Sequence, residues 1–166
     1  MTTDWNAIGA YLEDHGLVLA SAESCTAGAV AQLLGGLEGG GRWLQCSFIV
    51  DAPHAEQLVL GVSEASIRRH GLVSEPVAVE MAIAALDHSN ANLAIANVGR
   101  AETGAVCFAW AMLAAGWVRS SATTRVFQGS PDEVRRMAAQ FAIAELPARH
   151  QELVRREQEE LRRRFA

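Results

Sequence analysis

Lysine is missing from this 166-residue sequence, since all fourteen basic residues are arginine. No lysine can therefore serve as a catalytic base or charge partner anywhere in the chain. Tyrosine is nearly absent and occurs once, as Tyr11. The net charge is −5, and an acidic domain without a basic stripe is not expected to bind nucleic acid.

Cysteine is also sparse, and none of the thiols has C-x-x-C spacing. The three are Cys25, Cys46 and Cys107. A small, odd number of cysteines indicates reduced thiols and a cytoplasmic location. The histidines and cysteines form no cluster with metal-ligand spacing, so neither a metal nor a cofactor is expected. The stretch "MTTDWNAIGAYLEDHG" is not a signal peptide, and no apolar run reaches the length of a membrane span.

The hydrophobic pattern predicts alternating helices and strands. Helical spacing and capping residues predict helices over 4–15, from Thr26 onward, over 51–61 after a turn, and over 63–71, 74–89 and 130–146. Apolar runs predict strands over 17–21, 43–50, 91–99, 104–113 and 120–129. Residues 35–41, "GGLEGGG", are predicted to form a flexible loop. The alternation favours an α/β fold, a single-domain α/β/α sandwich with a mixed sheet over residues 1–166.

The C-terminal segment 147–166 is highly charged and predicts a mostly solvated helix with one narrow apolar stripe. A homodimer contact is the alternative role for this helix. Binding of RNA is not expected, because glutamates interleave the arginines.

The stretch "SAESCTAG" (21–28) stands between a predicted strand and a predicted helix. It places a carboxylate, two hydroxyls and a thiol in adjacent positions: Glu23, Ser24, Cys25 and Thr26. A side chain on such a turn projects beyond the strand end, where free N–H groups of the next helix can hold an anion or oxyanion. The turn is therefore either a nucleophile turn or a helix start with Ser24 or Thr26 as a plain N-cap.

"AESCTAG" closely resembles the A-E-S-C-T-G-G signature of the CinA C-terminal domain family. The segments "GVSEASIRRHGLVSEPVAVEMAIAAL" (61–86) and "VFQGSPDEVR" (126–135) are similar to two further family segments. The resemblance covers about residues 5 to 146. It implies the fold of metal-independent serine amidohydrolases that remove ammonia from nicotinamide mononucleotide, with Ser24 as the nucleophile. It also implies a small nucleotide-like ligand near Glu23, Cys25, Thr26, Gly28, Gly99 and Arg100.

The sequence departs from the family where the serine would be activated. The family's T-Y-S-x-x-x-K segment falls on "VDAPHAE" (50–56), which places Asp51 at the tyrosine position and Glu56 at the lysine position. The glycine-rich G-I-A-G-P loop is shortened to "NVGRAETGAV" (97–106), which keeps Gly99. A serine hydroxyl is a weak nucleophile without a base, and losing a general base costs about 10²- to 10⁴-fold in rate.

Three hypotheses follow from these departures. The leading one is a protein that has lost ordinary amidase activity and keeps the Ser24 turn as a ligand-binding corner. The second is an active amidohydrolase with an altered substrate, in which His54 or Glu56 takes the proton of Ser24. The third is a non-catalytic dimeric interaction module.

The neighbouring residues carry further expectations. Arg100 is expected to pair with Glu56. Glu23 is predicted to be a structural carboxylate that orients the turn. Cys25 is predicted to be a buried small residue at the start of the helix.

Overall fold

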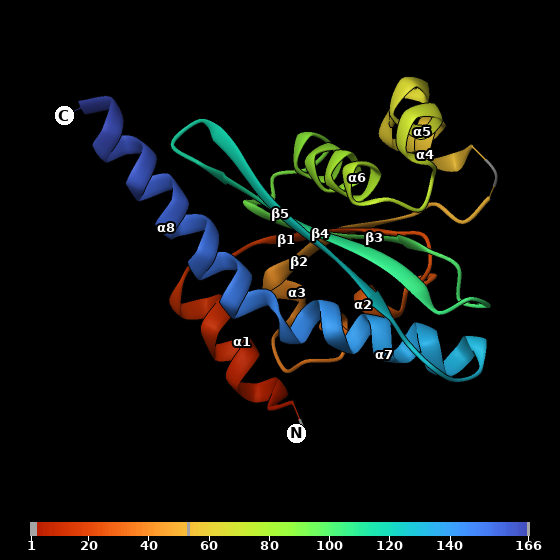
Figure 1. Ribbon diagram of the computed structural model, residues 1–166. Coiled ribbons are helices and arrows are strands. Elements are labelled where there is room, and N and C mark those ends of the chain that lie inside the picture. The colour runs from red at the N-terminus through yellow and green to blue at the C-terminus, as the bar shows by residue number, and fades with distance from the viewer. Residues whose placement is uncertain (1–2, 53, 166) are drawn as a thin grey trace.

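The computed structural model describes residues 3–52 and 54–165, which form a five-stranded sheet between two helical layers (Figure 1). The strands are β1 (Leu19–Glu23), β2 (Leu44–Ile49), β3 (Leu93–Gly99), β4 (Ala105–Ala114) and β5 (Trp117–Val126). Their order is β2-β1-β3-β4-β5. Strand β1 is parallel to β2 and β3, whereas β4 is antiparallel to β3 and β5. The predicted α/β fold with a mixed sheet is confirmed.

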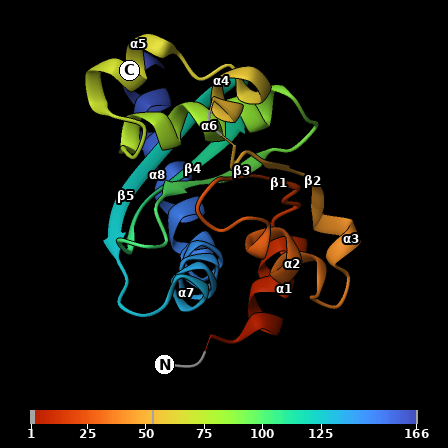
Figure 2. The same ribbon diagram turned by 90° about the vertical axis from the view of Figure 1, so that its right-hand side faces the viewer.

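Helices cover both faces of this sheet. They are α1 (Trp5–Asp14), α2 (Ala29–Gly35), α3 (Gly40–Trp43), α4 (Ala55–Leu60), α5 (Glu64–His70), α6 (Glu75–Asp87), α7 (Pro131–Ala144) and α8 (Leu146–Phe165). Figures 1 and 2 show α4, α5 and α6 on one side of the sheet and α1, α2 and α7 on the other.

Side-chain size differs between the two faces of the sheet, because alternate residues of a strand point to opposite sides. Large buried side chains face α1, α2, α7 and α8; they include Leu19, Leu93, Ile95, Phe108 and Trp110. Buried alanines face α6; they include Ala20, Ala22, Ala94, Ala96, Ala109 and Ala111. The alanine face lets α6, which is itself rich in buried alanine, pack closely on the sheet.

Side-chain caps begin the helices predicted over 4–15 and 130–146. Asp4 accepts hydrogen bonds from the N–H groups of Asn6 and Ala7, both at 3.1 Å. Ser130 and Glu133 form a reciprocal capping box at the start of α7. These local signals fix helix starts because a side-chain acceptor satisfies N–H groups that have no partner within the helix.

Other local predictions are wrong. The helix expected from Thr26 begins at Ala29, with Gly28 at its N-cap and in the left-handed region at φ 97°. The interpretation of Ser24 or Thr26 as a plain N-cap fails because neither hydroxyl accepts a bond from the start of α2. The loop predicted over 35–41 is confirmed for residues 36–39 and wrong at its ends, because Gly35 closes α2 and α3 begins at Gly40.

The charged helix α8 packs by one narrow stripe, as predicted. Leu146 and Leu153 are fully buried, and the Arg149 guanidinium lies 4.7 Å from the centre of the Trp110 ring. Arginines 162–164 at the far end are exposed. Within residues 3–52 and 54–165, no helix has both the length and the apolar character that a membrane span requires.

A small aromatic cluster joins α1 to α8. The Tyr11 hydroxyl lies 2.8 Å from Nδ1 of His150, which is buried. The ring of His15 stacks on Tyr11 at a centroid distance of 4.0 Å. Burial, and to a lesser degree the nearby His15, lowers the pKa of His150.

This lowered pKa predicts a loss of stability in mild acid. Unfolded His150 binds a proton at a higher pH than folded His150, so the free energy of unfolding falls as the pH drops below about 6.5. Urea denaturation between pH about 7.5 and about 5.5 measures this slope. We expect His150→Gln to flatten it, whereas the exposed-site control His54→Gln keeps it. Equal slopes in wild type and His150→Gln would contradict the assignment.

Candidate active site

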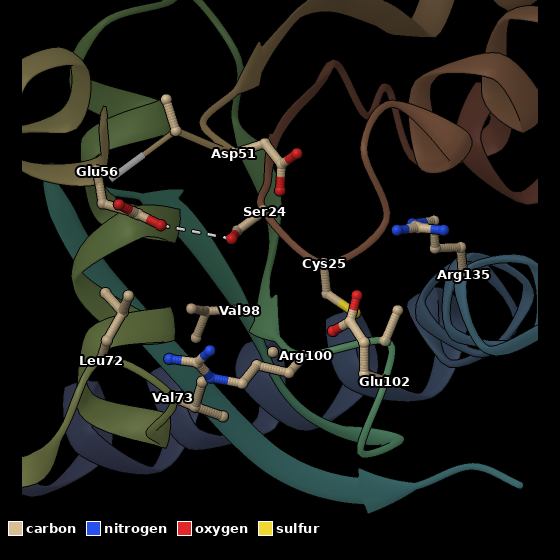
Figure 3. Close-up of a pocket in the computed structure, with 13 residues that line it drawn as sticks. Ser24, Cys25, Asp51, Glu56, Leu72, Val73, Val98, Arg100, Glu102 and Arg135 are labelled. Atoms are coloured by element: carbon tan, nitrogen blue, oxygen red, sulfur yellow. Dashed lines mark hydrogen bonds between the residues drawn. The ribbon is translucent and has the colours of Figure 1, made fainter. Parts of the chain in front are cut away.

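The candidate site lies where the three parallel strands end. Ser24 follows β1, Asp51 lies just beyond β2, and Arg100 follows β3. Open α/β sheets bind ligands outside the carboxyl ends of their strands. A cavity of about 320 Å³ opens at this edge, and these three residues line it (Figure 3).

Glu23, at the end of β1, holds the turn that carries Ser24. Its carboxylate is fully buried. It accepts hydrogen bonds from the hydroxyls of Ser21 (3.0 Å) and Thr26 (2.6 Å) and from the N–H groups of Gly28 (2.9 Å), Val30 (3.1 Å) and Ala31 (2.9 Å). Glu23 is thus structural, as expected.

This arrangement corrects the expectation that free N–H groups of α2 hold an anion. The N–H groups of Gly28, Val30 and Ala31 already donate to Glu23. They complete an internal carboxylate cap and are not available to an external oxyanion.

Asn97 of β3 is the second anchor of the turn. The N–H of Ser24 donates to its carbonyl oxygen at 3.0 Å, and the N–H of Thr26 donates to its Oδ1 at 3.1 Å. Its Nδ2 donates to the Thr26 hydroxyl at 2.8 Å. Asn97 is not among the site residues predicted from the sequence, although a lone amide inside the buried strand "LAIANVG" is an available signal. Polar groups in such strands require partners.

Ser24 faces the carboxylate of Glu56 inside the cavity. Ser24 is 8% exposed and Glu56 is 3% exposed. The Ser24 hydroxyl donates to Oε1 of Glu56 at 3.4 Å, a long hydrogen bond drawn as the dashed line in Figure 3. Asp51 flanks Ser24 on another side. The hydroxyl of the signature motif therefore lies among acidic groups.

The cations of the cavity lie apart from this pair. Among the described residues, no basic group lies within 4.0 Å of Glu56, so the expected ion pair with Arg100 is wrong. Arg135 enters from α7 on the opposite side of Ser24 and pairs with Asp132 at 3.0 Å. Sequence reasoning missed Arg135 and Glu102 as cavity residues, although Arg135 ends the family-like segment 126–135.

Cys25 lines the cavity but has the properties of a structural thiol. It is buried, and burial is the main cause that raises the pKa of its thiol to about 11. The charge of Arg135 opposes this shift, and the charges of Glu102 and Asp51 add to it. The thiolate is the reactive form of cysteine, so Cys25 is a poor nucleophile at neutral pH.

The remaining predicted site residues divide between the cavity and its supports. Gly99 lines the cavity, where an added Cβ would lie 2.5 Å from the Ala105 carbonyl oxygen. The described cavity lining does not include Glu23, Thr26 or Gly28, which build the turn, or His54. His54 is exposed, and its Nδ1 lies 2.9 Å from Oε1 of Gln57.

The connection from β3 to β4 is short and closed. Residues 100–104 form a turn in which the N–H groups of Thr103 and Gly104 donate to the Arg100 carbonyl, at 3.2 and 3.0 Å. Arg100 and Glu102 of this turn are exposed and line the cavity that Ser24 lines.

Comparison with known proteins gives a consistent result. A family model described as the CinA C-terminal domain matches residues 3–149. The nicotinamide-nucleotide amidohydrolase PncC of Escherichia coli K12 is 35% identical over 150 residues, which cover 84% of this chain and 88% of that protein. Protein YdeJ of the same strain is 33% identical over 141 residues, which cover 78% of each chain.

Solved structures show the same fold. The structure of a CinA superfamily protein from Escherichia coli matches with a TM-score of 0.78 at 32% identity and covers 86% of each chain. The structure of competence damage-inducible protein A from Klebsiella pneumoniae matches with a TM-score of 0.82 at 27% identity, covering 90% of this chain and 96% of that one.

Replacing Glu23 should damage the fold as well as the site. Glu23→Ala leaves buried donors unsatisfied, and we expect it to lower the free energy of unfolding by about 3 kcal/mol or more. Urea denaturation gives this value, with Glu102→Ala at the exposed cavity rim as the control. A Glu23→Ala protein as stable as the control would refute the structural role of this carboxylate.

Proposed function

Because the chain belongs to the CinA C-terminal domain family, we propose that the cavity beside Ser24 is a small-molecule site that lacks ordinary nicotinamide-nucleotide amidase activity. The observation that carries this proposal is the buried carboxylate of Glu56, 3.4 Å from the Ser24 hydroxyl. Glu56 stands at the position where the family resemblance places a catalytic lysine.

The first consequence concerns the activation of Ser24. A serine hydroxyl needs a base to take its proton as it attacks. A carboxylate is a far weaker base than a lysine amine, and the contact to Ser24 is long. Loss of an effective base costs about 10²- to 10⁴-fold in rate.

The second consequence concerns the charge that forms during the reaction. Attack on a carboxamide places negative charge on the carbonyl oxygen beside Ser24. At about 6 Å and an effective dielectric of about 20, one carboxylate raises the energy of that charge by roughly 3 kcal/mol, or about 10²-fold in rate. Asp51, on another side of Ser24, adds to this effect. The N–H groups of α2 offer no compensation because Glu23 already binds them.

An assay of ammonia release from nicotinamide mononucleotide tests this proposal. We expect the wild type to release no more ammonia than Ser24→Ala, because neither protein can activate and stabilise the attack. Release by the wild type that Ser24→Ala abolishes would overturn the proposal.

In the same assay, the double variant Asp51→Tyr/Glu56→Lys tests whether these two positions cause the proposed loss of amidase activity. Ammonia release above the wild-type level would assign the loss to these two positions. Silence in this variant as well would assign it to the shortened β3–β4 connection.

The Ser24–Glu56 contact also favours a second candidate function, a serine hydrolase with a carboxylate base and a different substrate. A fluorophosphonate probe distinguishes the two candidates because it labels activated serines. Under the leading proposal we expect no labelling of the wild type. Labelling that is lost in Ser24→Ala and retained in the control Ser47→Ala would favour the hydrolase.

The interaction-module hypothesis receives less support from α8. Its described apolar residues pack within the chain: Leu146 and Leu153 are buried, and Val154 and Leu161 are half-buried. The helix therefore presents no wide apolar stripe to a second copy. A homodimer and a cytoplasmic location stay predictions.

A further inference from the structure

We propose that the acidic end of the Ser24 cavity, formed by Glu56 and Asp51, binds a small ring that carries a cationic nitrogen group such as an amidinium or ammonium. The same end rejects a ring that carries a carboxylate in place of that group. This inference rests on the proposed function in that it uses the same cavity as a binding site. It adds the chemical class of the ligand.

The main determinant is the incomplete hydrogen bonding of Glu56. This carboxylate is 3% exposed, and among the described residues its hydrogen-bond donor is the Ser24 hydroxyl at 3.4 Å. A buried carboxylate is costly unless donors or a cation satisfy its oxygens. Glu23 meets this requirement within the chain, whereas Glu56 does not. A ligand N–H⁺ donor would supply a short, charge-assisted hydrogen bond.

A second carboxylate reinforces the preference. Figure 3 shows Asp51 and Glu56 on different sides of Ser24, both at the wall of the same cavity. Asp51 is exposed, so its oxygens are accessible from the cavity mouth. A cation at Ser24 would interact with two negative charges, and an anion there would meet both as repulsion.

The adjacent wall suits an apolar body. Leu72 and Val73 are half-buried and Val98 is buried, and all three line the cavity below Glu56 in the view of Figure 3. A cavity of about 320 Å³ accommodates a small ring. Apolar contact also removes water from around Glu56 and so strengthens its interaction with a bound cation.

The cations of the cavity do not neutralise this end. Arg135 lies across the cavity, beyond Cys25, and is paired with Asp132. Arg100 is exposed, and within residues 3–52 and 54–165 it makes no ion pair with Glu56. Arg100 also lines the cavity, so Arg100→Gln, which removes a positive charge there, should increase the affinity for a cation.

Three isosteric probes test the charge preference: benzamidine, benzamide and benzoate carry a cationic, neutral and anionic group on the same ring. Calorimetry or ligand-observed NMR gives their affinities for the wild-type protein. We expect benzamidine to bind more tightly than benzoate by about tenfold or more, which corresponds to about 1.4 kcal/mol. Benzamide should lie between them.

Variants assign the preference to Glu56. Glu56→Gln keeps the shape of the side chain and removes its charge, so the preference for benzamidine should fall to the smaller part that Asp51 supplies. Glu102→Gln, at the exposed rim of the same cavity, is the matched control and should retain it. Glu56→Lys should shift the preference toward benzoate, and thermal unfolding verifies that each variant is folded.

The opposing outcomes are equally definite. Tighter binding of benzoate, no binding of benzamidine at millimolar concentration, or a preference unchanged in Glu56→Gln would each overturn the inference. Ammonia release from nicotinamide mononucleotide is measured separately. A wild type that deamidates this compound and still prefers benzamidine would refute the proposed function alone, whereas an inactive wild type that prefers benzoate would refute this inference alone.

Discussion

The geometry of the site depends on one buried carboxylate. Glu23 ends β1, accepts three N–H groups from the start of α2, and binds the Thr26 hydroxyl within the turn. It thereby replaces the external anion that a free helix N-terminus would attract. The position of Ser24 above the sheet follows from this cap and from the bonds of Asn97 to the same turn. The position of Ser24 is therefore set by bonds within the fold and does not depend on catalytic activity.

Glu23 and Glu56 have the same side chain and opposite surroundings. Glu23 is satisfied by hydroxyl and N–H donors and is part of the fold. Glu56 is also buried, but its carboxylate has a single long bond, to Ser24, within the part of the chain that the structure describes. A buried carboxylate with free acceptor capacity at a cavity wall favours cations and opposes developing anions. The same charge accounts for both the predicted loss of amidase activity and the predicted ligand class.

Sequence reasoning predicted the fold well because the fold depends on local signals. The alternation of apolar strands with capped helices gave the α/β layers, and caps such as Asp4 and Ser130 fixed helix starts. The errors came from tertiary contacts. Thr26 resembles an N-cap in the sequence. In the structure, the carboxylate of Glu23 accepts the N–H groups at the start of α2 instead, although Glu23 lies five residues before Gly28. The contacts of Arg100, Asn97 and Arg135 depend on how β3 and α7 meet the turn, which residue spacing along the chain does not reveal.

We infer that the carboxylate of Glu56 prevents negative charge from forming beside Ser24. Phenylboronic acid tests it directly, because an activated serine converts trigonal boron into a tetrahedral, negatively charged adduct that resembles the intermediate of amide hydrolysis. Boron-11 NMR distinguishes the two forms. We expect the boron to stay trigonal in the presence of the wild-type protein. A tetrahedral adduct that forms with the wild type and is absent with Ser24→Ala would contradict it.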